Sequence, residues 1–126
     1  MKIILDKIKV YPAHALCRPD VRLILSSVPV AWTEGIELVR LSASRASSVA
    51  LYSHYDKTFT ISSRGHSKEE TLHLVLSELA AHALGFKRRT FGRLQARYQS
   101  QVESLVVPMV VELLPKLSQK KIWLDQ

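Results

Sequence analysis

The sequence predicts an α+β fold, in which a small antiparallel sheet packs on a buried central helix and a kinked C-terminal helix closes the other side. Residues 57–63 alternate between apolar and polar side chains, as a strand with one buried face does. Residues 71–84 form an almost continuous apolar segment after a helix-capping sequence, and Pro108 interrupts a second apolar segment. We therefore expect a single domain that spans residues 1–126.

Composition excludes several classes of protein. The chain has 126 residues, 47% of them hydrophobic, and one cysteine, so it is neither a disulfide scaffold nor a disordered chain. No apolar run approaches the roughly 18 residues of a membrane span, and the N-terminus lacks the apolar core of a signal peptide. We expect a cytoplasmic protein that does not enter a membrane.

The first half of the chain contains the candidate strands. Residues 2–10 are rich in isoleucine and predict a strand, and residues 20–27 predict a short helix with one apolar face. Residues 37–63 contain three alternating stretches, which we interpret as an antiparallel meander with one buried face. Trp32 is expected to fill the core beneath the loop before this meander.

The second half predicts two helices. In Ser67-Lys68-Glu69-Glu70 the serine hydroxyl can accept from the Glu70 N–H while the Glu70 carboxylate reaches back, which is a capping box. The helix that follows is apolar on most sides, so we expect it to be buried, and Gly85 suits its C-terminal end. A second helix over residues 91–107 should kink or end at Pro108, because proline lacks an N–H, with a further helical stretch through Leu114.

The buried helix carries polar side chains at its centre. Glu78 and His82 are four residues apart and share one helix face. Because burying a lone carboxylate is unfavourable, Glu78 must have a partner or a function. One interpretation is an internal hydrogen bond or ion pair with His82 or an arginine. The other is the remnant of a reaction centre.

Residues 76–86 (LSELAAHALGF) resemble the active-site helix of the zincin-like metallopeptidases, whose H-E-x-x-H motif holds zinc through two histidines and uses the glutamate as general base. In the segment S-E-L-A-A at 77–81, Glu78 falls on the general base, and Ser77 and Ala81 fall on the two ligands. Neither residue can replace an imidazole. His82 lies one position later, about 100° further round the helix.

The surrounding sequence extends the resemblance over residues 36–107. Zincin-like domains place a short meander, ending in an edge strand over the substrate cleft, before this helix. They often continue with a helix that supplies a third ligand from a stretch like E-x-E-S, and residues 101–104 (QVES) are similar. The resemblance implies a domain that has lost its zinc site and acts as a non-catalytic binding or regulatory protein. It implies an unidentified protein partner and no cofactor.

A metal site could survive only with other ligands. Glu78 and His82 would then be joined by one of three outside groups, namely His54, His66 or Glu103, and Glu78 would polarise a metal-bound water in a metal-dependent hydrolase. The remaining chemistry-bearing side chains favour structural roles: we expect His73 to be a core or boundary residue with its hydrogen bonds satisfied, and Cys17 to be a buried thiol.

A basic stretch gives a further alternative. The formal net charge is +7, and the segment between Glu78 and Glu103 contains no acid. Its basic residues are Lys87, Arg88, Arg89, Arg93 and Arg97, and the last three of these arginines are spaced by four on one helix face. Such a face suits phosphates, which predicts an accessory protein that binds DNA or RNA. It is equally typical of a solvated helix face, or of an arginine that neutralises Glu78.

Overall fold

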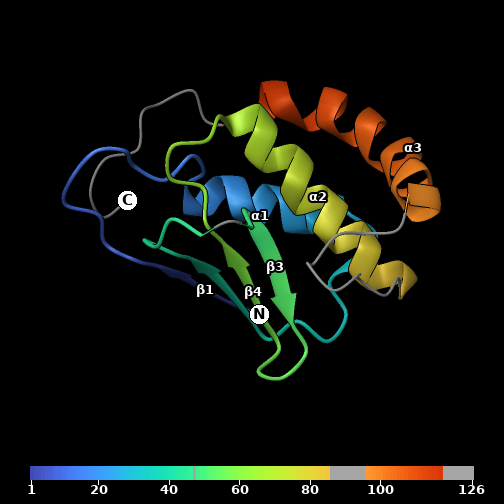
Figure 1. The fold of residues 1–126 in the computed structure, drawn as a ribbon, viewed down its shortest axis with the longest axis horizontal. Coiled ribbons are helices and arrows are strands. Elements are labelled where there is room, and N and C mark those ends of the chain that lie inside the picture. The colour runs from blue at the N-terminus through green and yellow to red at the C-terminus, as the bar shows by residue number, and fades with distance from the viewer. Residues whose placement is uncertain (47, 86–95, 118–126) are drawn as a thin grey trace.

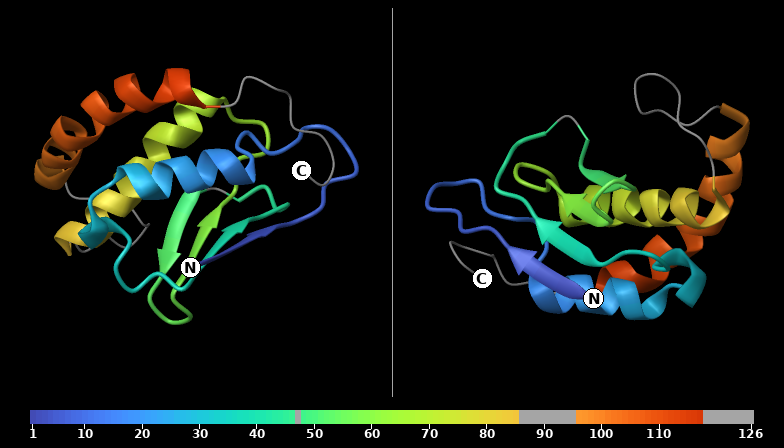
Figure 2. Two further views of the ribbon diagram at one scale, coloured as in Figure 1. Left: turned by 180° about the vertical axis from the view of Figure 1, so that it is seen from behind. Right: turned by 90° about the horizontal axis from the view of Figure 1, so that it is seen from below.

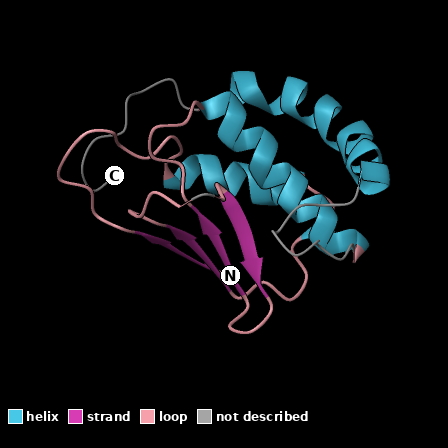
Figure 3. Ribbon diagram, in the orientation of Figure 1, coloured by secondary structure: helices cyan, strands magenta, loops and turns pink. Residues whose placement is uncertain are grey.

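The α+β fold class is confirmed. The computed structural model describes residues 1–46, 48–85 and 96–117, with only the backbone described for residues 96 and 97. The elements in chain order are β1 (Lys2–Leu5), α1 (Arg18–Ser27), the 3-10 helix η1 (Val30–Trp32), β2 (Leu38–Leu41), β3 (Ala50–Ser53), β4 (Thr58–Ile61), α2 (Lys68–Leu84), α3 (Ala96–Leu113) and the 3-10 helix η2 (Leu114–Lys116). The helices lie together on one side of the sheet (Figures 1 and 3).

The sheet is mixed, which corrects the predicted antiparallel arrangement. Its strand order is β1-β2-β4-β3; β1 pairs with β2 and β2 with β4 in parallel, and only β3 and β4 are antiparallel. The predicted meander was therefore wrong in its topology, since β2 is next to β4 rather than β3. Alternation determines which face of a strand is buried but not which strand lies beside it. As a result β3 is an edge strand.

One face of the sheet forms the floor of the core. The inward-pointing residues of the two central strands are Val39, Leu41, Phe59 and Ile61, all buried, whereas Arg40 points to solvent. The helices cover these residues with buried side chains from α1, α2 and α3, among them Ile24, Leu76 and Val106. Trp32 is also buried in this core, as predicted. The alternating strands thus have one apolar face toward the helices and one polar face toward water.

Helix α2 begins and ends as predicted. The Ser67 hydroxyl accepts a hydrogen bond from the Glu70 N–H at 3.0 Å, and Gly85 ends the helix in the left-handed conformation at φ 67°. The predicted capping box is only half formed, because the Glu70 carboxylate contacts His66 Nδ1 instead of the Ser67 N–H. The acids of the first turn lie near the positive end of the helix dipole, which favours this start.

Helix α3 continues through Pro108 to Leu113 and packs along α2 (Figure 2). Its side toward the core carries the buried residues Val102, Val106, Val110 and Leu113. Their spacing of four, four and three residues places them on one stripe, which explains why packing keeps the helix intact despite the proline. In the described parts of the chain, none of the helices has the length and apolar character that a membrane crossing requires.

Candidate functional site

Glu78 lies inside the molecule and bonds to the main chain of the edge strand. Glu78 is in the middle of α2 and is only 5% exposed. Its Oε2 atom accepts a hydrogen bond from the Tyr52 N–H at 3.0 Å. Tyr52 pairs with Phe59 across the β3–β4 hairpin, yet this N–H is directed away from β4, on the free side of β3. The carboxylate therefore fastens the sheet edge to the central helix.

His82, one turn later on α2, also bonds to the main chain. Its Nε2 atom lies 2.7 Å from the Glu34 carbonyl oxygen. Because a carbonyl only accepts, Nε2 carries the proton and Nδ1 is the acceptor nitrogen. Nδ1 is buried without a hydrogen-bond partner in the described chain. The interaction ties the C-terminal half of α2 to the loop before β2.

An aromatic cluster covers this side of α2. The centroid of the Tyr52 ring lies 4.4 Å from that of His82 and 4.7 Å from that of His54. The Tyr52 hydroxyl donates to the Gly35 carbonyl oxygen at 3.3 Å. Tyr52 therefore contacts α2 with its main chain and with its ring, and it contacts the Glu34–Gly35 loop with its hydroxyl.

The two positions that the zincin-like motif assigns to zinc ligands do not fit a metal. Ala81 has no donor atom, and the Ser77 hydroxyl donates to the His73 carbonyl oxygen, in its own helix, at 2.8 Å. The structure brings His54 near His82, with ring centroids 5.9 Å apart. Of the other two proposed ligands, His66 contacts Glu70 and Glu103 contacts His73. Among the residues that the structure describes, no three His, Cys, Asp or Glu side chains are grouped to hold a metal ion.

The N-terminal half of α2 meets α3 through a side-chain ion pair. His73 Nε2 lies 2.8 Å from Glu103 Oε1, and both side chains are partly exposed to water. His73 is thus a boundary residue, as predicted, and Glu103 is engaged with it. This half of α2 is more open to solvent than the half that carries Glu78 and His82.

No protein-family model matches this chain, and no curated protein or solved structure matches it either. The resemblance to zincin-like metallopeptidases therefore rests on the residues of the chain itself.

The side chains of the predicted basic stretch lie outside the part of the chain that the structure describes. Residues 86–95 lie outside the described residues, and they include Lys87, Arg88, Arg89 and Arg93; of Arg97 the structure describes only the backbone, in the first turn of α3. The predicted nucleic-acid surface and the predicted arginine partner of Glu78 both stay predictions.

Two side chains of the segment before α1, those of Cys17 and His14, are buried. Cys17 is a buried thiol, as expected, and burial raises its pKa above the ordinary value. His14, to which the sequence assigned no role, is buried, and its Nε2 donates to the Asp6 carbonyl oxygen at 2.8 Å. Burial lowers the pKa of His14.

Sequence reasoning missed the partners of Glu78 and His82. The Tyr52 N–H and the Glu34 carbonyl are main-chain groups, which every residue except proline supplies. The one available signal was the order of elements, because a strand before the capped helix could reach its polar face. The residue types at positions 52 and 34 do not indicate that these main-chain hydrogen bonds form.

Proposed function

We propose that this chain is a non-catalytic, protein-binding domain of zincin-like ancestry, in which Glu78 is a structural acceptor. The hydrogen bond from the Tyr52 N–H to Glu78 Oε2 carries the proposal. A general base needs its carboxylate within reach of a water or a substrate proton. Here one carboxylate oxygen is directed at the main chain of the protein itself.

The neighbouring polar groups support the same conclusion. The Ser77 hydroxyl, the His82 Nε2 and the Tyr52 hydroxyl each donate to a main-chain carbonyl of this chain. A reaction centre reserves such groups for substrate or metal. Here the Ser77 bond stays within α2, and the bonds of His82 and Tyr52 join α2 and β3 to the loop before β2. The side chains at positions 77 and 81 lack the imidazoles that zinc would need in the resembling motif.

The order of the elements supports the ancestry. An edge strand, β3, contacts the glutamate of the central helix through its main chain, and the strand β4 leads into the capped α2. Zincin-like domains place an edge strand over the substrate cleft before this helix; here the edge strand β3 also comes before α2, with β4 between them in the chain. In this chain that strand is fastened by the carboxylate.

Metal content and hydrolysis test the proposal. The protein is purified without chelator, its transition metals are measured by mass spectrometry, and its cleavage of casein is followed with and without added Zn²⁺. We expect far less than one equivalent of metal, no cleavage, and the same result for Glu78→Gln and His82→Ala. The control is His73→Ala, which removes a histidine of the same helix outside the site.

A metal-dependent hydrolase would give the opposite result. Glu78 and His82 would then contribute to a bound metal with ligands beyond those described. One equivalent of metal that is lost in Glu78→Gln or His82→Ala but kept in His73→Ala, together with cleavage, would overturn the proposal.

A further inference from the structure

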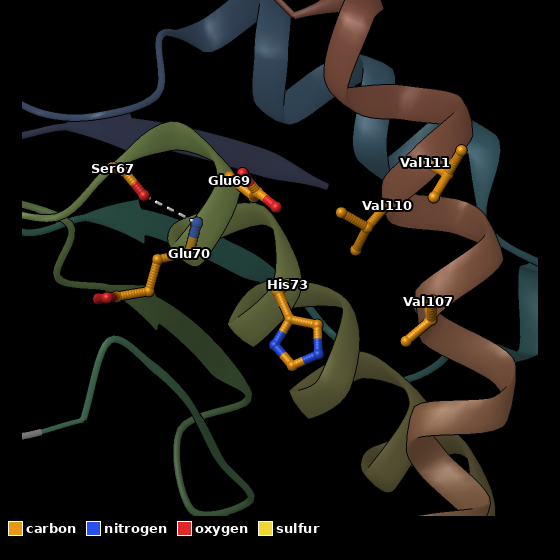
Figure 4. A pocket seen from close by; sticks show the side chains of 7 residues that line it. All are labelled: Ser67, Glu69, Glu70, His73, Val107, Val110 and Val111. Atoms are coloured by element: carbon orange, nitrogen blue, oxygen red, sulfur yellow. Dashed lines mark hydrogen bonds between the residues drawn. The ribbon is translucent and has the colours of Figure 1, made fainter.

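An open groove runs between the N-terminal half of α2 and the C-terminal half of α3. Its volume is about 430 Å³, and it lies on the opposite half of α2 from Glu78 (Figure 4). One wall consists of Glu69, Glu70 and His73, and the other of Val107, Val110 and Val111. In Figure 4 the His73 ring and the Val110 side chain lie in the space between the two helices.

The α3 wall of the groove is an apolar stripe that the described part of the protein covers only in part. The three valines, Val107, Val110 and Val111, lie four, seven and eight positions after Glu103. At this spacing they share a face of the helix with Glu103. Val107 is 47% exposed and Val111 is 71% exposed, whereas Val110 is buried at the floor. Contiguous exposed valines beside a groove are typical of a surface that another molecule covers.

The charge of the groove is opposite to that of the whole protein. The formal net charge of the chain is +7, yet the described residues that line the groove include neither lysine nor arginine. The Glu69 carboxylate is directed toward α3 (Figure 4), whereas that of Glu70 is directed away from α3 and contacts His66. Glu103, which pairs with His73, adds a second carboxylate beside the groove. An acidic and apolar groove attracts a partner that is basic and apolar.

We infer that this groove binds a short amphipathic helix of a partner protein, with an apolar face against the valine stripe and lysine or arginine side chains against Glu69 and Glu103. The inference rests on the proposed function and names the class of partner. A trough between two helices accepts the apolar face of a third helix, whose anchors recur at i, i+3, i+4 and i+7. Basic flanking residues set its orientation.

A designed peptide tests the inference with the full chain. The probe is a helical peptide of about 18 residues with leucines on one face and lysines on the other, labelled for fluorescence anisotropy. The matched peptide carries glutamate in place of every lysine. We expect the lysine peptide to bind at least about tenfold more tightly, and its affinity to fall between about 50 and 500 mM salt.

Two variants locate the binding. Val111→Asp and Glu69→Lys should each weaken the lysine peptide about tenfold, because one charges the apolar stripe and the other reverses the charge of the acidic wall. The matched controls are Val30→Asp and Glu34→Lys, also at exposed positions but at the other end of α2. These should change the affinity less than about twofold. Amide shifts in NMR spectra should be confined to α2 and α3.

Other results overturn the inference. Equal binding of the two peptides, or equal effects of the groove and control variants, would mean that the groove does not select a basic helix. A dimer in sedimentation that Val111→Asp dissociates would make a second copy the occupant. Stoichiometric metal with hydrolysis would overturn the proposed function and leave the peptide result standing, so the two failures are distinguishable.

Discussion

The two halves of α2 use polar side chains in different ways. In the C-terminal half, Glu78 and His82 bond to main-chain atoms of β3 and of the loop before β2. In the N-terminal half, His73 pairs with the side chain of Glu103 across an open groove. Bonds to the main chain of another element fix the position of a strand or a loop, whereas ion pairs in water contribute little to stability. The difference suggests that one half maintains the fold and the other is free to bind.

Removal of the Glu78 carboxylate should give the largest loss of stability. Glu78→Leu fills the space but leaves the Tyr52 N–H without its acceptor, which should lower the free energy of unfolding by about 1–3 kcal/mol. Glu78→Gln keeps an acceptor oxygen and should lose less than about 1 kcal/mol. Urea denaturation measures both values. Equal stability of the two variants would mean that the hydrogen bond to β3 is unimportant.

The sequence predicted helix α2 but not the order of the strands that pack against it. The capping serine, Gly85 and the apolar run between them determine α2, because each acts through residues close in the chain. The same run identified Glu78 as a buried acid. The order of the strands was not predictable, since β1 and β4 reach β2 through long connections and alternation does not select a neighbour.

The site was less predictable than the fold for a physical reason. Glu78 and His82 find their partners in main-chain groups 26 and 48 residues away along the chain. Main-chain donors and acceptors are the same at every residue, so no side-chain pattern reports them. The motif resemblance predicts a general base at Glu78, which stays a prediction, and it did not indicate the contact of this carboxylate with the Tyr52 N–H. The groove beside His73 depends on where α3 packs, which the sequence did not indicate.

His14 extends the comparison to another histidine that bonds to the main chain, and this one is buried. Burial lowers its pKa below the ordinary 6.5, so the folded state takes up a proton less readily than the unfolded state. Its contribution to stability is therefore fully present above about pH 6.5 and is lost as the pH falls through the lower folded value. We expect the unfolding free energy to decrease from pH 7.5 to pH 5, measured by urea denaturation.

The variant His14→Gln separates this histidine from the other groups that titrate in the same range. It should flatten the decrease with falling pH, whereas the control His54→Gln, at an exposed position, should leave it unchanged. If the two variants show the same pH dependence as the wild type, His14 is protonated as easily in the folded state as in the unfolded state.

The ion pair at the open end of α2 should contribute little. A double-mutant cycle with His73→Ala and Glu103→Ala should give a coupling free energy below about 1 kcal/mol, because both side chains are partly exposed. About 1 M NaCl should reduce it further. A larger coupling that persists in salt would mean that the pair is a structural contact like that of Glu78, and the contrast between the two halves would be lost.

Removal of two arginines from the basic stretch should have the smallest effect of all, because the expected change in peptide binding by the groove is slight. Combining Arg93→Ala with Arg97→Ala should change the affinity for the lysine peptide less than about twofold. Under the nucleic-acid hypothesis the same variant weakens binding to short DNA or RNA and flattens its dependence on salt. Titrations of both ligands at two salt concentrations separate the two surfaces. No binding of nucleic acid at low salt would reject that hypothesis.

The exchange of the Tyr52 amide hydrogen is the most direct measure of what Glu78 does. We predict that this N–H is protected from exchange in the wild-type protein and in Glu78→Gln, although it lies on the free side of an edge strand, and that it exchanges much faster in Glu78→Leu. NMR detection at this one residue reads the bond itself. A Tyr52 amide that exchanges as fast as in an unfolded peptide, or at the same rate with leucine at position 78, would contradict a structural role for the carboxylate.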